Sequence, residues 1–346
     1  MSKIKLFLVV TSISLLGAAC TPGGINVQPE NDGGIWFTTN DGETWQHRSN
    51  VFIDRLSKKT IQSVNIKKLI FSPGDNTKLF AITESNGLWI SWNEAFYWDL
   101  ILPNSDINDI AVNPDNTRII YAAISGNIAM TRDEGINWKA TYTSDSSSVE
   151  ISSIALNPTK TNILYAATNQ GDILISEDSG ISWREYTKVK GKLINMTFHP
   201  SQPLTVYAGI AGIGLMRSRD EAKTWESFSE EFKEFSGTNT YRDFVLIPSG
   251  VVYASSHGLL RSLNHGKDWA SLPLISGKND PNIYALAVNP DNPLEVFYGT
   301  RSTFYHSIDG GFNWIPRKLP SSRTASDILI NPDDTSKMYL GVKLNR

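Results

Sequence analysis

The amino-acid sequence predicts an all-β fold, a seven-bladed β-propeller built from four-stranded antiparallel blades. Three observations lead to this prediction. An eight-residue phrase that ends in Trp occurs seven times, at steps of 40 to 53 residues. A second phrase, two short runs rich in Val, Ile, Tyr and Ala around a Pro/Asn/Asp turn, also occurs seven times and alternates with the first. The repeats begin and end in the middle of a unit.

The eight-residue phrase is the more regular of the two. Every copy has Ser or Thr first, Asp or Asn third and Trp eighth, and five copies have Gly fifth, with Ala95 and Ala222 in the other two. We expect its third and eighth residues to be structural. In chain order they are Asn40 and Trp45, Asn93 and Trp98, Asp133 and Trp138, Asp178 and Trp183, Asp220 and Trp225, Asn264 and Trp269, and Asp309 and Trp314.

The chemistry of the phrase is that of a tight turn. In "SEDSGISW", the short side chains of Ser176 and Asp178 can bond nearby backbone N–H groups, and Gly180 permits a positive φ. Trp183 can then cover the neighbouring sheet, and a buried Trp removes about 150–250 Å² from water. Calcium binding is the alternative, but calcium takes six to eight oxygen ligands and one phrase offers one or two carboxylates. We therefore predict a structural turn, with no metal and no cofactor.

Each repeat unit holds four predicted strands. The phrase "ISSIALNPTKTNILYAATNQ" (151–170) supplies the first two, "GDILIS" supplies the third, and the fourth begins at the Trp. The N-terminal "GGIWFTTNDGETWQHRS" is a third and fourth strand, and the C-terminal "ASDILINPDDTSKMYLGV" is a first and second strand. We expect these two halves to pair and close the ring, which removes the open sheet edges that invite aggregation.

The first 33 residues form separate segments. Lys3 and Lys5 precede a short apolar run, which is typical of a signal peptide rather than a membrane span, so we assign residues 1–19 to a signal peptide. The segment "LLGAAC" resembles a bacterial lipobox, which implies a lipid on Cys20, the single cysteine. The alternative is a plain cleaved signal. Residues 20–33 are a predicted flexible tether, and residues 34–346 are the propeller.

The pattern S/T-x-D/N-x-G-x-x-W resembles the Asp-box, or bacterial neuraminidase repeat. Sialidases, xyloglucan-active glycosidases, sortilin-type receptors and photosystem II assembly/stability factors carry this repeat, and the resemblance covers essentially residues 34–346. It is specific for architecture and weak for function, because one scaffold serves unrelated activities. The chain looks most like the photosystem II assembly factors, which are single seven-bladed propellers and often lipid-anchored. That similarity implies a role in complex assembly.

Binding residues are expected on the face opposite the eight-residue phrases. In an antiparallel blade, the first-to-second and third-to-fourth turns share one face. The second-to-third turns and the crossings between blades share the other, where binding loops gather on a rigid scaffold. For each candidate the alternative is an ordinary solvated loop residue. The candidates are Glu84, Asn169, Gln170, Arg242, Asp243, His257 and Arg301.

The functional prediction is an exported, lipid-anchored binding or assembly scaffold of the cell envelope, monomeric, with a protein or glycan ligand. With 35 acidic and 32 basic residues, the chain has no excess of positive charge for nucleic acid. No catalytic residue is assigned, because neither G-x-S-x-G nor H-E-x-x-H occurs. The alternative is a secreted carbohydrate-active hydrolase, which needs two carboxylates about 5–10 Å apart in a central cleft. A sortilin-like receptor is disfavoured, because those rings are larger.

Overall fold

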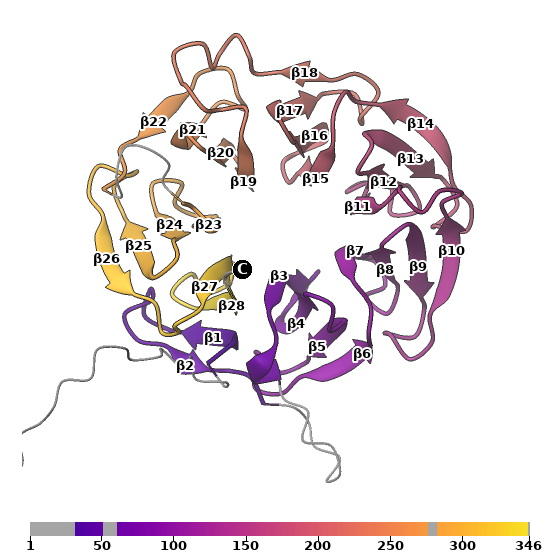
Figure 1. Cartoon of the computed structure of the whole chain (residues 1–346), viewed down its shortest axis with the longest axis horizontal. Coiled ribbons are helices and arrows are strands. Elements are labelled where there is room, and N and C mark those ends of the chain that lie inside the picture. Colours follow the sequence, from indigo (N-terminus) through magenta and orange to yellow (C-terminus); the bar gives the residue numbers. More distant parts are fainter. Residues whose placement is uncertain (1–31, 51–60, 276–281, 345–346) are drawn as a thin grey trace, which may run out of the picture.

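The computed structural model describes residues 32–50, 61–275 and 282–344. These residues form twenty-eight strands in seven four-stranded antiparallel sheets, arranged as a ring (Figure 1). The predicted seven-bladed β-propeller is therefore confirmed. The predicted signal peptide, Cys20 and most of the tether lie outside the described residues. Within those residues, no helix has the length and apolar character that crossing a membrane requires.

The strands follow one order in every blade, from the innermost first strand to the outermost fourth. The two blades after the N-terminal strands are β3 (Ile66–Ser72), β4 (Asp75–Thr83), β5 (Leu88–Ser91) and β6 (Asp99–Leu102), then β7 (Ile107–Val112), β8 (Ile120–Ile124), β9 (Asn127–Thr131) and β10 (Lys139–Thr143). The next two are β11 (Ile151–Leu156), β12 (Leu164–Thr168), β13 (Asp172–Ser176) and β14 (Arg184–Lys188), then β15 (Leu193–His199), β16 (Gln202–Ile210), β17 (Gly214–Ser218) and β18 (Glu226–Ser227).

The remaining blades complete the ring. They are β19 (Tyr241–Ile247), β20 (Gly250–Ser255), β21 (Gly258–Ser262) and β22 (Ala270–Leu272), then β23 (Ala285–Val288), β24 (Val296–Gly299), β25 (Thr303–Ser307) and β26 (Ile315–Lys318), and last β27 (Thr324–Ile330) and β28 (Met338–Lys343) with β1 (Gly34–Thr38) and β2 (Gln46–His47). A short 3-10 helix, Ile61–Ser63, precedes β3.

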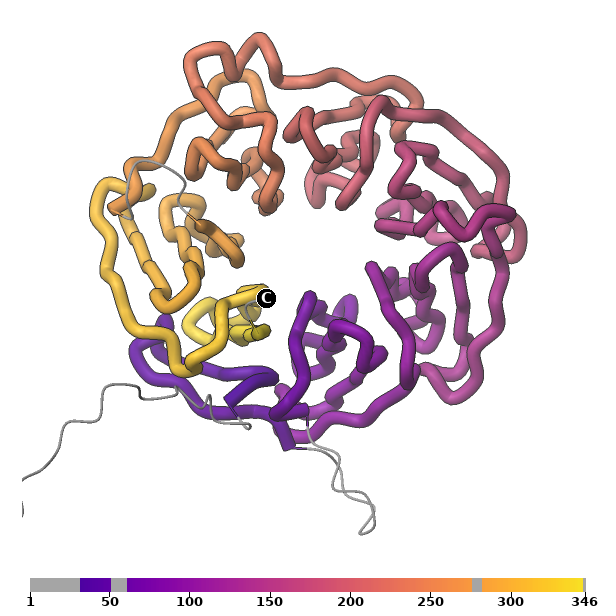
Figure 2. The backbone as a smooth tube through the Cα atoms, in the orientation of Figure 1, coloured from indigo at the N-terminus to yellow at the C-terminus, as the bar shows by residue number. Residues whose placement is uncertain are grey.

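The ring is closed by pairing strands from the two ends of the chain, as the sequence predicts. The closing sheet has the order β2-β1-β28-β27, and Trp36 of β1 lies opposite Leu340 of β28. Figure 2 shows the indigo N-terminal segment beside the yellow C-terminal segment. Backbone hydrogen bonds of β1 and β28 are satisfied by each other, so neither strand is left as an open edge.

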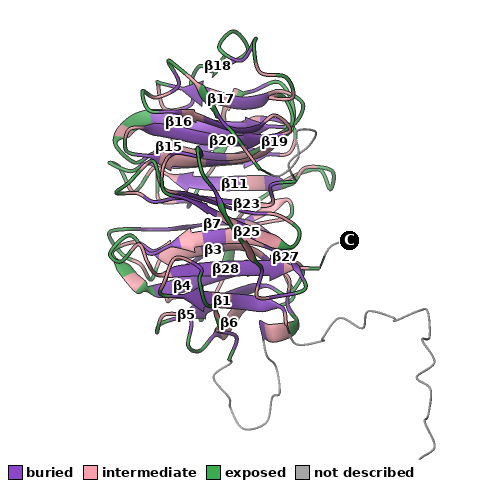
Figure 3. Ribbon diagram, turned by 90° about the vertical axis from the view of Figure 1, so that its left-hand side faces the viewer, coloured by how far each residue is buried: buried purple, intermediate pink, exposed green. Residues whose placement is uncertain are grey.

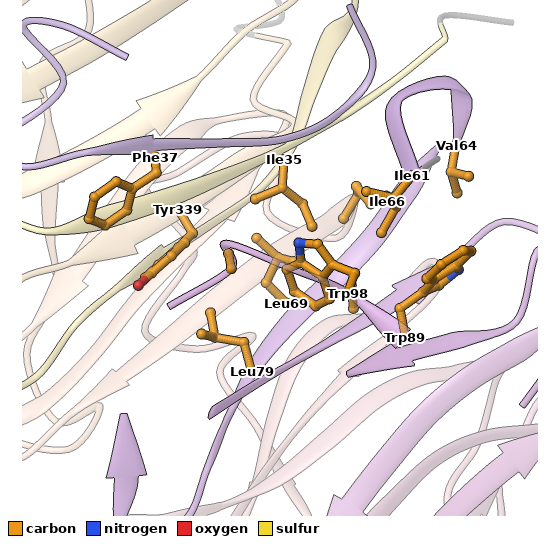
Figure 4. Packing of buried hydrophobic residues seen from close by; sticks show 12 residues of the cluster. Ile35, Phe37, Ile61, Val64, Ile66, Leu69, Leu79, Trp89, Trp98 and Tyr339 are labelled. Carbon is orange, nitrogen blue, oxygen red and sulfur yellow. The ribbon is translucent and has the colours of Figure 1, made fainter. Parts of the chain in front are cut away.

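The core lies between neighbouring blades. The second strands consist of β-branched, aromatic and small residues that are buried on both faces, as in β8, "IYAAI". Figure 3, a side view of the ring, shows buried strands such as β16, β20 and β28 between two sides that carry exposed loops. In one cluster, Ile35 and Tyr339 from the closing blade pack against Leu69, Leu79 and Trp98 of the next blade (Figure 4). Burial of such residues contributes about 25 cal/mol per Å² of apolar surface.

The first strands line the centre of the ring and share one irregularity. Among the described residues, six of the seven carry a register shift at the same place, close to the start of the strand. In β3 the shift lies between Ile66 and Lys68, and in β7 it lies between Ile107 and Asp109. Such bulges bend a strand and re-aim its side chains. They therefore set the direction of the residues that surround the central opening.

Candidate functional site

The two faces of the ring differ in composition. We call the face with the eight-residue turns the turn face; the turns between first and second strands lie there too, because the strands are antiparallel. Six of the seven eight-residue turns donate a backbone hydrogen bond to that neighbouring turn of their own blade, as Ser179 does to the carbonyl of Asn162 at 2.9 Å. The opposite face, with the second-to-third turns and the crossings between blades, we call the loop face.

The third residue of each eight-residue turn holds the turn together. Ser176 Oγ donates to Asp178 Oδ1 at 2.9 Å and accepts from the N–H of Gly180 at 2.9 Å. The backbone N–H of Ser182 donates to Asp178 Oδ1 at 2.9 Å, and the hydroxyl of Ser182 donates to Oδ2 at 2.6 Å. The bond from the first to the third residue occurs in all seven turns. Both oxygens of Asp178 are thus occupied by donors of its own turn.

These donors stabilise the ionised carboxylate. The hydroxyl and backbone N–H of Ser182 lower the pKa of Asp178 to about 2. The backbone N–H and side chain of Asn137 lower the pKa of Asp133 to about 2 in the same way. Hydrogen bonds to the charged form are the cause in both turns.

The Trp at the eighth position joins neighbouring blades. Trp98 is fully buried, and its Nε1 donates to the carbonyl of Arg48 in the preceding blade at 2.9 Å. Trp138 donates to the carbonyl of Ile101 at 3.0 Å in the same manner. Trp183 is only half-buried, and its Nε1 reaches Thr141 Oγ1 at 3.3 Å. Trp314 donates to the carbonyl of Pro273 at 2.7 Å in the same manner, so four of the seven turns are hydrogen-bonded to the preceding blade through their Trp, although the burial of the Trp varies.

Two of the predicted binding residues hold a neighbouring crossing. Asn169 accepts a hydrogen bond from the N–H of Glu150 at 3.1 Å and donates to the carbonyl of Ser148 at 3.2 Å. Gln170 donates to Ser148 Oγ at 3.3 Å. Both residues lie on the loop face, between β12 and β13, as predicted. Their contacts anchor the segment that enters their own blade.

The other loop-face candidates are spread around the ring. Glu84 accepts from Asn65 Nδ2 at 3.0 Å, and Arg301 is exposed on the turn before β25. The ring of His257 contacts the carbonyl of Ser236 at 3.1 Å, so it holds the long crossing between β18 and β19. The structure does not bring these three residues together, and their role in binding stays a prediction.

The centre of the ring contains a cavity of about 720 Å³. It is lined by all seven first strands and by two prolines that follow them. Four of its lining residues are charged, namely Lys68, Asp109, Asp243 and Asp327. Asp243 is among the residues that the sequence predicts for binding, whereas its neighbour Arg242 does not line the cavity.

The charged residues occupy matching positions in their strands, at the bulge. Three of the four reach the next first strand around the ring. Asp327 Oδ2 accepts from the N–H of Leu69 at 2.6 Å, Lys68 Nζ lies 2.8 Å from Asp109 Oδ1, and Asp109 Oδ2 accepts from the N–H of Ile154 at 3.2 Å. Side chains at this level therefore form a belt of hydrogen bonds that joins blade to blade.

The belt is interrupted beside Asp243. The matching residue of the next strand is Ala285, which has no polar side chain. Asp243 accepts a hydrogen bond at 2.8 Å from the N–H of Phe244, its own neighbour, instead of one from the next blade. Burial, together with the charge of Asp327, raises the pKa of Asp243 to about 7. Burial raises the pKa of Asp327 to about 6.

Sequence reasoning missed three of these four charged residues. Lys68, Asp109 and Asp327 occur in the first-strand phrases "KKLIF", "INDIAV" and "SDILI". The available signal was a charged residue at one aligned position of a strand that is otherwise apolar. In a β-strand such a residue faces a polar partner or a cavity, because an isolated buried charge is costly.

Comparisons with known proteins identify the fold. No family model matches the chain, and no curated protein matches it. Among solved structures, a GH74 enzyme from Niastella koreensis has a TM-score of 0.64 at 16% identity, covering 81% of this chain and 51% of that chain. YCF48 bound to a D1 peptide has a TM-score of 0.63 at 16% identity, with 81% and 94% covered. A GH74 xyloglucanase from Xanthomonas campestris has a TM-score of 0.62 at 16% identity, and the match covers 81% of this chain and 51% of that chain.

These proteins are similar to the chain in fold alone, since their sequence identity to it is 16% in each case. This chain spans about half the length of both GH74 proteins and nearly the whole length of YCF48. The chain thus has the seven-bladed propeller fold, and the comparisons show its likeness to these proteins in fold alone.

Proposed function

We propose that this protein is an exported scaffold, anchored to the cell envelope by a lipid on Cys20, that binds a protein partner on its loop face. The single closed ring carries this proposal, because it is a rigid platform that presents seven sets of loops in one plane. A neighbour of the same size, YCF48, was solved with a D1 peptide bound, which supports a protein ligand. In this proposal the eight-residue turns are Asp boxes with a structural role.

The direction of β1 supports the choice of face. As the third strand of its blade, β1 starts on the loop face, so the described chain begins there, at Asp32, and twelve residues separate Asp32 from Cys20. Twelve residues reach at most about 40 Å when extended. A protein anchored in this way holds its loop face within reach of partners in or near the membrane.

Lipidation is tested with Cys20→Ser. We expect the wild-type protein in the membrane fraction and the variant in the soluble fraction, because a diacylated cysteine is the anchor in this proposal. Fractionation followed by immunoblotting measures this. A variant that stays on the membrane would contradict lipid anchoring. It would not bear on partner binding, which the next experiment tests.

Partner binding is tested by cross-linking the full-length protein in its native envelope and identifying the captured proteins. A candidate partner is then purified and titrated against two variants. Arg301→Glu reverses a charge on the loop face, and Arg132→Glu does the same on the turn face; both side chains are exposed. We expect the first to weaken binding about tenfold and the second to leave it unchanged. The reverse result would place binding on the turn face.

A glycoside hydrolase is the second candidate, and the carboxylates in the central cavity favour it. Asp243 and Asp327 interact electrostatically there, and Asp243 has the raised pKa that suits a general acid. The assay is release of reducing ends from xyloglucan and related β-glucans. Turnover that is lost in both Asp243→Asn and Asp327→Asn would establish the hydrolase. If the wild-type protein released no reducing ends, the hydrolase would be ruled out for these substrates and the binding scaffold would stand.

A further inference from the structure

The central cavity has a charged floor on the loop-face side and extends toward the turn face. Its lining starts at the bulge residues Lys68 and Asp243 and ends at Pro290 and Pro332, in the turns that follow the first strands. Lys67 and Arg242, one residue earlier in their strands, are not part of the lining. Since the first strands run from the loop face to the turn face, a ligand reaches the floor from the turn face.

The wall above this floor is apolar. Two residues beyond the floor, the seven first strands contribute six apolar side chains and Thr197. Three of the six, Ile70, Val245 and Leu329, are large, and the other three are alanines. A ligand that enters from the turn face therefore contacts hydrocarbon first and charge last.

The floor has an excess of negative charge. It holds three carboxylates and one ammonium group, and Lys68 is engaged with Asp109 at 2.8 Å. Asp327 accepts a hydrogen bond from the N–H of Leu69, and this donor carries no charge that could neutralise the carboxylate. Asp109 and Asp327 each accept a hydrogen bond from a backbone N–H of the next first strand, whereas Asp243 accepts one from its own neighbour, Phe244. Lys68 attracts Asp243 and Asp327 electrostatically as well, but its ion pair is with Asp109, so three carboxylates share one ammonium group.

We propose that this cavity binds an alkylammonium group, such as a lysine side chain on an exposed segment of a protein. The alkyl stem packs against Ile70, Val245 and Leu329, and the ammonium group donates hydrogen bonds to the carboxylates of Asp243 and Asp327. This site is separate from the loop-face site of the proposed function and does not depend on it.

The shape and charge of the cavity select this chemistry over its competitors. An anion would face three carboxylates and be repelled. A neutral alcohol would fit the apolar wall but would leave the charge on the floor uncompensated. An ammonium group is compact, has three donors, and sits at the end of a narrow stem, whereas a guanidinium group is planar and broader. The charge of the bound ligand would also keep both carboxylates ionised.

The probe for this site is n-hexylammonium, with n-hexanol as a neutral control of the same length. Binding to the full mature chain is followed at pH 8 by calorimetry and by methyl NMR signals. We expect n-hexylammonium to shift the methyl signals of Ile70, Val245 and Leu329, and to bind at least tenfold more tightly than n-hexanol. Equal affinities, or shifts confined to the loop face, would overturn the proposal.

Variants locate the charge that matters. Asp243→Asn and Asp327→Asn should each weaken n-hexylammonium at least tenfold and leave n-hexanol unchanged. Asp309→Asn, on the turn face, should bind both probes as the wild type does. Unchanged n-hexylammonium affinity in both floor variants would contradict the site.

The wild-type protein gives a measurement that needs no variant. Lowering the pH from 8 to 5 protonates Asp243 and Asp327 and should weaken n-hexylammonium about tenfold without affecting n-hexanol. A pH-independent affinity would also overturn the proposal. The loop-face variant Arg301→Glu should leave n-hexylammonium binding unchanged, so failure of this site and failure of the proposed function are distinguishable.

Discussion

The pKa values of aspartates in this protein are shifted in opposite directions, depending on where the fold places the side chain. Asp178 lies in a solvated turn whose donors stabilise its charge, and its pKa falls to about 2. Asp243 lies at the floor of the central cavity, where burial and the charge of Asp327 raise its pKa to about 7. The side chain is the same in both cases; hydrogen bonding dominates at the first site and desolvation at the second.

The floor aspartates predict a loss of stability as the pH rises. An unfolded Asp has a pKa of about 3.9, below the folded values of Asp243 and Asp327. The folded protein thus binds more protons between pH 4 and 7, so its stability falls as the pH rises over this range and levels off above about pH 7. We expect Asp243→Asn to raise the free energy of unfolding at pH 8 by roughly 1–2 kcal/mol, and by less at pH 5.

Chemical denaturation at pH 5 and pH 8 measures this difference. The matched control is Asp133→Asn, on a turn whose equivalents in other blades already carry Asn. Because the pKa of Asp133 lies near 2, that substitution should leave the change between pH 5 and 8 as in the wild type. Parallel pH profiles for Asp243→Asn and the wild type would refute the prediction.

The seven Trp residues are equivalent in sequence but not in burial. Trp98 is fully buried in the cluster of Figure 4, whereas Trp183 is half-buried. The expectation that Trp183 covers the neighbouring sheet therefore holds only in part. We expect Trp98→Ala to lower the free energy of unfolding by about 3–5 kcal/mol and Trp183→Ala by about 2 kcal/mol. Urea denaturation of both variants tests this, and equal losses would contradict it.

At the scale of elements, each eight-residue turn ties three pieces of structure together. Its own side chains close the turn, and in six of the seven turns the fourth residue bonds the neighbouring turn, as Glu134 does to the carbonyl of Arg118 at 3.0 Å. In four of them the Trp donates a hydrogen bond to the preceding blade. In addition, Tyr121 of the blade before donates its hydroxyl to the carbonyl of Ser179 at 3.0 Å. The turn is thus a junction between blades as well as a link between strands.

The glycine of this turn is required for two reasons in the blade of Gly180. Its φ is +77°, and a Cβ there would lie 2.6 Å from the ring of Tyr121. We expect Gly180→Ala to lower the free energy of unfolding by about 2–4 kcal/mol, since it combines left-handed backbone strain with a clash. Thermal and urea denaturation measure this.

The control is the reverse substitution at the same position of the next blade. Ala222 already occupies a φ of 66° and is fully buried. Ala222→Gly relieves backbone strain and removes one buried methyl, so its effect should stay within about 1 kcal/mol. A change of less than about 1 kcal/mol in Gly180→Ala would contradict the prediction, because it would mean that the ring of Tyr121 moves aside at no cost in stability.

At the scale of the whole molecule, stability depends on closing the ring. β28 lies between β27 and β1 in the closing sheet. Its residues Met338, Tyr339, Leu340 and Val342 are fully buried, and Tyr339 contributes to the cluster with Ile35. Removing this strand would leave two open edges and a gap in the core, because every blade packs against two neighbours.

Deletion of residues 338–346 should therefore abolish the cooperative unfolding transition and cause aggregation. The control is a circular permutant of the propeller in which a linker joins residue 343 to residue 34 and new ends open at Gly191, in the crossing between β14 and β15. These two ends of the propeller are close, since Gly34 pairs with Val342. We expect the permutant to unfold cooperatively near the wild-type midpoint. Calorimetry and size-exclusion chromatography compare the two; a well-folded deletion variant would contradict the role of closure.

The sequence by itself determined the number of blades, the order of strands and the closure by both chain ends. The reason is that these features are encoded locally, in the alternation of apolar residues and in turn chemistry such as that of Ser176, Asp178 and Gly180. Residues on the loop face were placed on the correct side, because strand order decides the side. Their partners could not be predicted, since Asn169 and His257 contact crossings that have no repeated pattern.

Only the tertiary structure decided what lies at the centre. Lys68, Asp109, Asp243 and Asp327 are far apart in sequence and meet because ring closure brings the starts of their strands together. Bulges turn the side chains inward, and Asp243 bonds the N–H of its own neighbour Phe244, whereas Asp109 and Asp327 bond an N–H of the next blade. The raised pKa values of Asp243 and Asp327 depend on how closely charged side chains from different blades approach one another, and the sequence of a single repeat does not contain that information.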